Sequence, residues 1–287
     1  MMRILVGYNG SAASRSALED LKNAGLPSAT QVLVLSVAEL WIPPRSAEEA
    51  GAAAAEAKLF LNTNFPEWSI YAETASGSPA REILARAETY KPDLIVLGEP
   101  PQSANKTGVL LGQTSKTVLS QAECPVRVAR GSEKSSPGRP RILVGFDGST
   151  GAIRAIESIV AKSWTNSPEV RLLAVTDLGV LTAIDGPVNG GEVKAVDTSA
   201  VSRWSQVIAK KALTSLNGSG IQASLKTRLG NAKDALVDEA EKWGANTIFV
   251  GPHGSANSFD RFLLGSVSAA VAARAHCSVE VVRPITY

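Results

Sequence analysis

Short apolar runs alternate with longer amphipathic segments along the first half of the chain. The apolar runs predict strands at Ile4–Tyr8, Gln31–Ala38, Glu67–Thr74, Asp93–Leu97 and Pro125–Ala129. The segments between them predict helices at Ser11–Ala24, Ala47–Asn62, Pro79–Tyr90 and Gln113–Gln121. The run Gln31–Ala38 is almost continuously apolar, which is typical of a strand buried on both faces.

The second half repeats this order of elements. Strands are predicted at Ile142–Phe146, Val170–Thr176, Gln222–Leu229, Thr247–Val250 and Val279–Val282. Helices are predicted at Thr150–Lys162, Asp197–Leu216, Ala232–Trp243 and Ser266–Ala275. Because strand and helix alternate throughout, the sequence predicts an α/β fold with right-handed crossovers. We expect two tandem doubly wound sheets of five parallel strands, each in the order 3-2-1-4-5 with helices on both faces.

The two halves are also similar residue by residue. Arg3–Ser11 and Arg141–Ser149 share seven of nine residues, and the two differences are Tyr for Phe and Asn for Asp. Val109–Arg130 and Phe262–Arg283 align without a gap and share ten of 22 residues. Such self-similarity predicts a duplicated structural unit. The offset grows from 138 residues to 153, so the second half carries about 15 extra residues.

The repeat predicts domain boundaries. We expect a first domain at 1–131, a linker rich in Gly, Ser and Pro at 132–140, and a second domain at 141–287. The extra residues fall at Leu178–Val196, which contains four glycines and is predicted to be a loop. This loop either lies over the ligand side of the sheet or is a solvated insertion.

The composition is typical of a globular protein, and it argues against several classes of function. Of the 287 residues, 44% are apolar and 20% are charged, and the net charge is only +2. The dispersed charge argues against nucleic acid as a partner, and we expect neither a membrane span nor a secretion signal. Cys124 and Cys277 occupy equivalent positions of the repeat, so we expect free buried thiols in a cytoplasmic protein. The spacing of the two His and two Cys residues does not predict a metal site.

A ligand site is predicted at the carboxyl ends of strands one and four of the second half. In this strand order the topology reverses between those strands, and ligands of open parallel sheets bind there. Phe146-Asp147 and Val250-Gly251 end these strands. A strand, a glycine loop and a helix start at Gly265 together favour phosphate binding. The alternatives are a tight turn for the glycine loop, and a turn-forming or N-capping role for Asp147.

These motifs resemble those of the universal stress protein family, and the resemblance covers nearly the whole chain. The ATP-binding members carry Gly-x2-Gly-x9-Gly-Ser/Thr after strand four. This chain has Gly251-x2-Gly254 and then ten residues, one more than the pattern, before Gly265-Ser266. The resemblance implies two flavodoxin-like (Rossmann-like) domains of the adenine nucleotide alpha hydrolase type. The final strands, Pro125–Ala129 and Val279–Val282, are candidates for exposed edges, and the resemblance implies that this edge mediates dimer contacts.

The resemblance further implies ATP as ligand, with Mg²⁺ as its counter-ion, in the second domain. Asp147 would contact the nucleoside or the Mg²⁺, and the backbone of Val175 would face the adenine. The other implied nucleotide-binding residues are Val250 and Gly251 at the adenine and ribose, and Gly254, Gly265, Ser266, Val267 and Ser268 at the phosphates.

The first half departs from the pattern at three positions. Asn9 replaces the Asp, Glu99-Pro100-Pro101 replaces the residues around the second glycine, and Gln113 follows Gly112. Proline lacks an N–H donor, and Glu99 brings a negative charge to the place where phosphate would approach. We expect the first domain to have lost triphosphate binding and to serve as a structural or regulatory partner.

The sequence therefore predicts an ATP-binding stress-response or signalling module, with the two domains pairing within the chain and a homodimer possible. One alternative is slow ATP hydrolysis or phosphate transfer, which needs Mg²⁺ and a water-positioning base near the γ-phosphate. Asp147 is the one carboxylate placed for that role, and no catalytic nucleophile is predicted. Another alternative is a dimerisation scaffold that binds no nucleotide.

Overall fold

The computed structural model describes residues 1–39, 45–100, 111–131, 138–176, 198–252 and 264–284. The predicted insertion at 178–196 and the middle of the predicted phosphate loop lie outside these residues. The elements of the first half are β1 (Met2–Gly7), α1 (Ala12–Asp20), the 3₁₀ turn η1 (Leu21–Asn23), β2 (Thr30–Ala38), α2 (Ala47–Asn64), β3 (Ser69–Ser76), α3 (Pro79–Tyr90), β4 (Leu94–Gly98), α4 (Gln113–Gln121) and β5 (Val126–Ala129).

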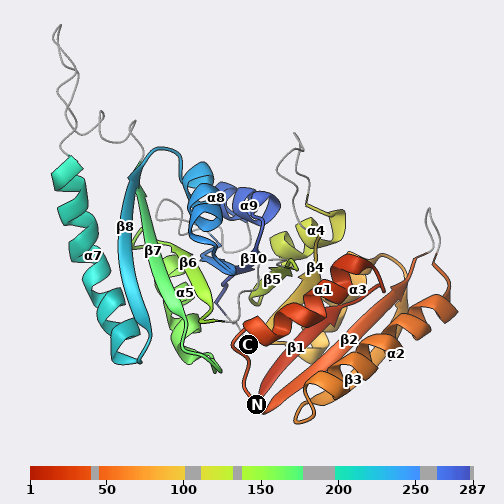
Figure 1. The fold of residues 1–287 in the computed structure, drawn as a ribbon. Helices are drawn as coiled ribbons and strands as arrows, with labels where there is room; N and C mark the ends of the chain where they lie inside the picture. The colour runs from red at the N-terminus through yellow and green to blue at the C-terminus, as the bar shows by residue number, and fades with distance from the viewer. Residues whose placement is uncertain (40–44, 101–110, 132–137, 177–197, 253–263, 285–287) are drawn as a thin grey trace, which may run out of the picture.

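The second half has the same architecture, as Figure 1 shows. Its elements are β6 (Arg141–Gly145), α5 (Thr150–Ala161), β7 (Glu169–Thr176), α7 (Thr198–Gly218), β8 (Gln222–Leu229), α8 (Ala232–Trp243), β9 (Thr247–Val250), α9 (Ser266–Arg274) and β10 (Ser278–Val281). The predicted α/β fold and the predicted strand order within each half are confirmed.

The described strands of both halves form one continuous sheet of ten, in the order β3-β2-β1-β4-β5-β10-β9-β6-β7-β8. Strands β5 and β10 pair in antiparallel register, with Glu280 opposite Arg127, and the other described pairs are parallel. The prediction that the two final strands are exposed edges is therefore wrong. Each covers the edge of the other, because an unpaired row of backbone donors and acceptors is satisfied by a second strand.

Local sequence signals explain where several helices begin. Ser46 and Glu49 form a reciprocal capping box at the start of α2, with hydrogen bonds of 3.0 and 2.7 Å. Ser11 and Ser149 cap α1 and α5 through their hydroxyl oxygens. Helix α1 ends at Asp20, earlier than predicted, since the chain tightens into η1 there.

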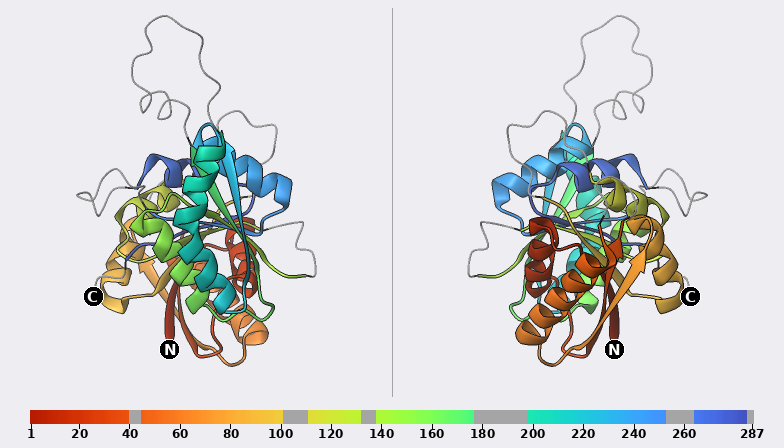
Figure 2. Two further views of the ribbon diagram at one scale, coloured as in Figure 1. Left: turned by 90° about the vertical axis from the view of Figure 1, so that its left-hand side faces the viewer. Right: turned by 90° about the vertical axis from the view of Figure 1, so that its right-hand side faces the viewer.

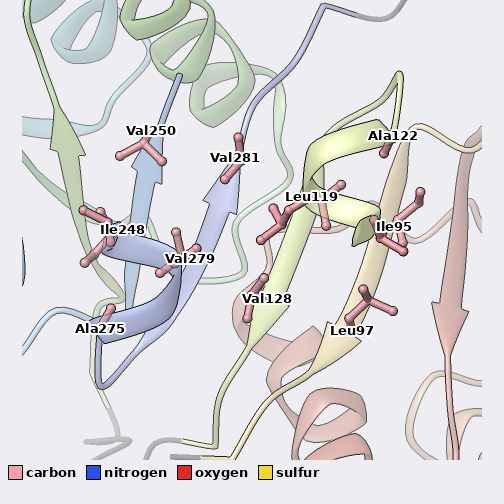
Figure 3. Close-up of a cluster of buried hydrophobic side chains, with 14 of the residues drawn as sticks. Ile95, Leu97, Leu119, Ala122, Val128, Ile248, Val250, Ala275, Val279 and Val281 are labelled. Carbon is pink, nitrogen blue, oxygen red and sulfur yellow. The ribbon is translucent and has the colours of Figure 1, made fainter. Parts of the chain in front are cut away.

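Helices cover both faces of the twisted sheet, as the end views in Figure 2 show. Successive strand residues face opposite sides, so Ile4 and Val6 join the core under α1 and α2, while Leu5 joins the core on the other face. That second core runs through both halves without a break. Figure 3 shows its centre, where Leu119, Val128, Ile248 and Val279 lie around the β5–β10 junction.

Candidate functional site: two equivalent crevices

Each half has a crevice where its first and fourth strands end. In the second half this crevice lies beyond β6 and β9, and its cavity volume is about 110 Å³. The residues that line it include six of the predicted nucleotide-binding residues, Asp147, Val175, Val250, Gly251, Val267 and Ser268. Gly265 and Ser266 begin α9 beside it, while Gly254 lies outside the described residues. The topology thus brings together side chains that are up to 121 residues apart, from 147 to 268.

Asp147 is exposed and holds the turn after β6. Its Oδ1 accepts a hydrogen bond of 2.9 Å from the backbone N–H of Ser149, which in turn caps α5. The turn-forming alternative is therefore present in the structure. Asn9 makes the equivalent bond to Ser11 in the first half, at 3.1 Å. An amide and a carboxylate serve this turn equally, so the charge of Asp147 is not needed for it.

Helix α9 presents its N-terminus to the second crevice. Its first residue, Ser266, follows Gly265, which makes no side-chain cap in the described part of the chain. The N–H groups of Ser266 and Val267 have no acceptor within a helix at these positions and lie at the positive end of its dipole. An anion can therefore be held there by backbone donors.

Two of the predicted phosphate donors are already engaged by the loop. The N–H of Gly265 donates to the carbonyl oxygen of Pro252 at 2.7 Å. The buried hydroxyl of Ser268 donates to the carbonyl oxygens of Gly251 and Pro252 at 2.8 and 3.1 Å. In this structure both groups hold Gly251 and Pro252 against the start of α9, so the N–H of Gly265 and the hydroxyl of Ser268 do not point to an open anion position.

Gly251 has a packing role that the sequence did not reveal. A Cβ placed on it would lie 2.7 Å from the carbonyl carbon of Gly151 in α5. Gly98, its counterpart in the first half, meets the backbone of Ala13 in the same way. Both glycines let a helix start lie against the end of a strand, and this requirement accounts for glycine without any ligand.

The first half retains its crevice, although its motif departs from the pattern. The cavity lies beyond β1 and β4, has a volume of about 230 Å³ and is lined by counterparts of the second-half residues, among them Asn9, Val37, Leu97, Thr114 and Ser115. Tyr8 stands where the second half has Phe146, and donates a 2.9 Å hydrogen bond to Glu56. Burial and this carboxylate raise the pKa of Tyr8 to about 12, so its phenol stays a neutral donor.

Among the described residues, no group of three His, Cys, Asp or Glu side chains is arranged to hold a metal ion. None of the helices searched in the described ranges is long and apolar enough to cross a membrane. Cys124 and Cys277 are both free and buried, as predicted.

Comparisons with known proteins all identify relatives in one family. The model of the universal stress protein family matches residues 1–130 and again residues 138–283. A universal stress protein of Mycolicibacterium smegmatis is 29% identical over 222 residues, which cover 75% of this chain and 69% of that protein. A universal stress protein of Methanocaldococcus jannaschii is 41% identical over 73 residues, 24% of this chain, and the match spans only 41% of that relative.

Solved structures share the fold over nearly the whole chain. A universal stress protein from Archaeoglobus fulgidus superimposes with a TM-score of 0.64 at 22% identity, covering 98% of each chain. A protein of Pseudomonas aeruginosa described as a putative universal stress protein gives a TM-score of 0.65 at 15% identity, covering 99% of this chain and 94% of its own.

Proposed function

The chain belongs to the universal stress protein family as a tandem of two domains, and on that premise we propose that its second domain binds ATP with Mg²⁺. The boundaries proposed for the two domains are 1–131 and 141–287, joined by 132–140. In this proposal the protein acts in the cytoplasm as a nucleotide-responsive stress or signalling module.

One observation carries the proposal. The N-terminus of α9 opens onto the crevice between the ends of β6 and β9, where the strand order reverses. Backbone donors at a helix start, an apolar cavity beside them and a carboxylate at its mouth are the elements that a nucleotide needs. The apolar side chains of Val175 and Val250 suit the base, and Asp147 suits a phosphate-bound cation.

The geometry divides the predicted phosphate residues into two groups. Ser266 and Val267 are proposed as donors to phosphate, because their N–H groups open the helix. Gly265 and Ser268 are proposed to hold the loop in place through their bonds to Gly251 and Pro252. Gly254 keeps its proposed role at the phosphates, although it lies outside the described residues.

Signalling would pass through the contact between the domains. Arg130 of the first domain donates a 2.6 Å hydrogen bond to the carbonyl oxygen of Ala272 in α9, the helix whose other end would bind phosphate. Nucleotide binding at one end of α9 therefore acts on a helix that the first domain holds at the other. Because β5 and β10 are paired within the chain, a homodimer would have to use a different surface.

Calorimetric titration of the full-length protein with Mg-ATP tests this proposal. Val267→Trp fills the second crevice, and Thr114→Trp makes the matched change at the equivalent, half-buried position of the first. We expect one ATP per chain, lost in Val267→Trp and kept in Thr114→Trp. A folded wild-type protein that binds no ATP would favour the scaffold alternative. If ATP binding is lost only in Thr114→Trp, the nucleotide binds in the first domain and the proposal is wrong.

A further inference from the structure

Glu99 brings a carboxylate to the start of α4 in the first domain. Its side chain points into the fold, and the residue is only 6% exposed. Its Oε1 accepts a 2.5 Å hydrogen bond from the hydroxyl of Ser115, and its Oε2 accepts a 3.2 Å hydrogen bond from the N–H of Gly112. The carboxylate therefore places a negative charge beside the start of α4, where it would repel an external anion from the N–H groups of Gln113 and Thr114.

The second domain has no counterpart of this carboxylate. Pro252 follows Gly251 just as Glu99 follows Gly98, and Gly265 and Ser268 correspond to Gly112 and Ser115. There the equivalent N–H and hydroxyl donate to neutral backbone carbonyls. The same donors thus bond an internal carboxylate in the first domain, whereas the acceptors described for them in the second domain are neutral.

The charges around the first crevice also disfavour phosphate. Glu39 and Glu99 both line it, and none of its described lining residues is Lys or Arg. The guanidinium that interacts electrostatically with Glu99 belongs to Arg130, which is 1% exposed; burial lowers the pKa of Arg130, and the charge of Glu99 opposes this. A phosphate group entering the crevice would meet two carboxylates and, among the described residues of its wall, no Lys or Arg.

The remainder of the crevice can still hold a small uncharged molecule. Leu35, Val37 and Ile83 form apolar walls, and Asn9, Ser11 and Thr114 add polar groups that can bond hydroxyls. Its cavity of about 230 Å³ is smaller than the roughly 300–1,000 Å³ of typical ligand pockets, which favours a small ligand. We propose that Glu99 is a built-in anion that keeps phosphate away from the start of α4 by its charge, and that the first domain binds a phosphate-free ligand of the nucleoside class. The nucleoside class rests on the function proposed for the equivalent second crevice.

The proposal is tested with adenosine and AMP on the full-length Val267→Trp protein, in which the second crevice is filled. We expect one adenosine per chain by calorimetry, and at least tenfold weaker binding of AMP. Adding Thr114→Trp should remove adenosine binding. Absence of adenosine binding in the folded Val267→Trp protein, or equal binding of AMP, would overturn the proposal. Either result would leave the Mg-ATP titration of the wild type unaffected, so the two proposals fail separately.

Changing Glu99 tests its role directly. Glu99→Ala keeps the backbone N–H that bonds Ala129 and frees the donors of Gly112 and Ser115. In the Val267→Trp background, AMP binding should strengthen at least tenfold while adenosine binding changes little. Glu123→Ala removes an exposed carboxylate from the same domain and should change neither. If Glu99→Ala does not fold, Glu99→Gln keeps the shape without the charge, and unchanged AMP binding in the folded variant would refute the role of Glu99.

Discussion

Arg127 lies directly opposite Glu280 across the antiparallel β5–β10 pair, and Nη1 of Arg127 donates a 3.2 Å hydrogen bond to Oε2 of Glu280. These residues occupy the same position of the repeat, 153 residues apart. Asp20 lies 2.6 Å from Nε of Arg127, and Lys162 lies 3.1 Å from Glu280. Two copies of the same domain joined at this edge would place like charges opposite each other. The buried pair therefore favours pairing of the first domain with the second.

Replacing Arg127 should destabilise the protein strongly. Arg127→Met leaves buried Asp20 without its ion pair and Glu280 with Lys162 alone, and breaking a buried pair costs about 3–5 kcal/mol. Adding Glu280→Met should cost less than the sum of the single changes, because these side chains contact each other. Urea unfolding of the wild type, both single variants and the double variant measures this coupling. Additive losses would show that the pair does not act as a unit.

A second contact between the domains obeys the repeat symmetry. Arg130 bonds the carbonyl of Ala272 in α9, and Arg283 bonds the carbonyl of Leu119 in α4. Each Arg and each carbonyl is the counterpart of the other by the same offset of 153 residues. Each domain thus holds the helix that begins beside the crevice of the other domain.

Periodicity in the sequence predicts the elements well, since their causes are local. The bounds of α3, α4, α8, β8 and β9 agree with the prediction residue for residue. The pairing of β5 with β10 could not be predicted in this way. It depends on contacts between side chains that are far apart in the sequence, such as Arg127 and Glu280.

The candidate site shows the same limit. The sequence indicates the charge of Glu99, but only the fold reveals that this charge is met by Ser115 and the N–H of Gly112. The motif likewise identifies Gly251 as a site glycine, whereas the close backbone of α5 is visible only in three dimensions.

Asp147→Asn should separate charge from structure in the second crevice. The amide can accept the bond from Ser149, as Asn9 does from Ser11, so the midpoint of urea unfolding should change little. Loss of the carboxylate should weaken Mg-ATP binding severalfold and reduce its dependence on Mg²⁺, because a cation ligand is removed. Calorimetry with and without Mg²⁺ checks this. An unchanged Mg²⁺ dependence would refute the proposed role of Asp147, and an unchanged rate of any measurable ATP hydrolysis would exclude it as a catalytic base.

Gly251→Ala should destabilise the second domain. The Cβ of alanine would lie 2.7 Å from the backbone carbonyl carbon of Gly151. Relieving such an overlap lowers the free energy of unfolding by about 1–3 kcal/mol. Gly51→Ala is the matched control in α2, where a new Cβ meets no atom within 4 Å. That change should stabilise by about 0.5–1 kcal/mol, because alanine favours the helix. Denaturant midpoints compare the two variants, and equal effects would contradict the packing role of Gly251.

Both cysteines should resist alkylation in the folded protein. Burial raises the pKa of Cys124 and of Cys277 to about 12, so little thiolate exists at pH 8. Mass spectrometry after treatment with iodoacetamide should detect no modification without denaturant and two modifications in urea. Rapid labelling of either thiol under native conditions would mean that the core around that cysteine opens readily to solvent.

Glu239 should make stability depend on pH in the acid range. The residue is 1% exposed, and burial raises its pKa, but hydrogen bonds of 2.7 Å from both Lys226 and Arg171 outweigh burial and hold the pKa below 4.5. A carboxyl group whose pKa is lower in the folded state stabilises that state above its unfolded pKa and loses this contribution as the pH falls.

The matched variant is Glu239→Gln, which keeps the shape of the side chain without its charge. We expect the wild type to unfold at higher urea concentration than the variant at pH 7. The difference should shrink as the pH falls below about 4.5 and through the lower pKa of the folded state. Arg171 also stacks on Trp243, with its guanidinium carbon 4.1 Å from the ring centroid, so it stays in place when the charge of Glu239 is removed. A difference in midpoint that is the same at pH 7 and pH 3 would mean that Glu239 stabilises through packing, since a packing contribution does not titrate.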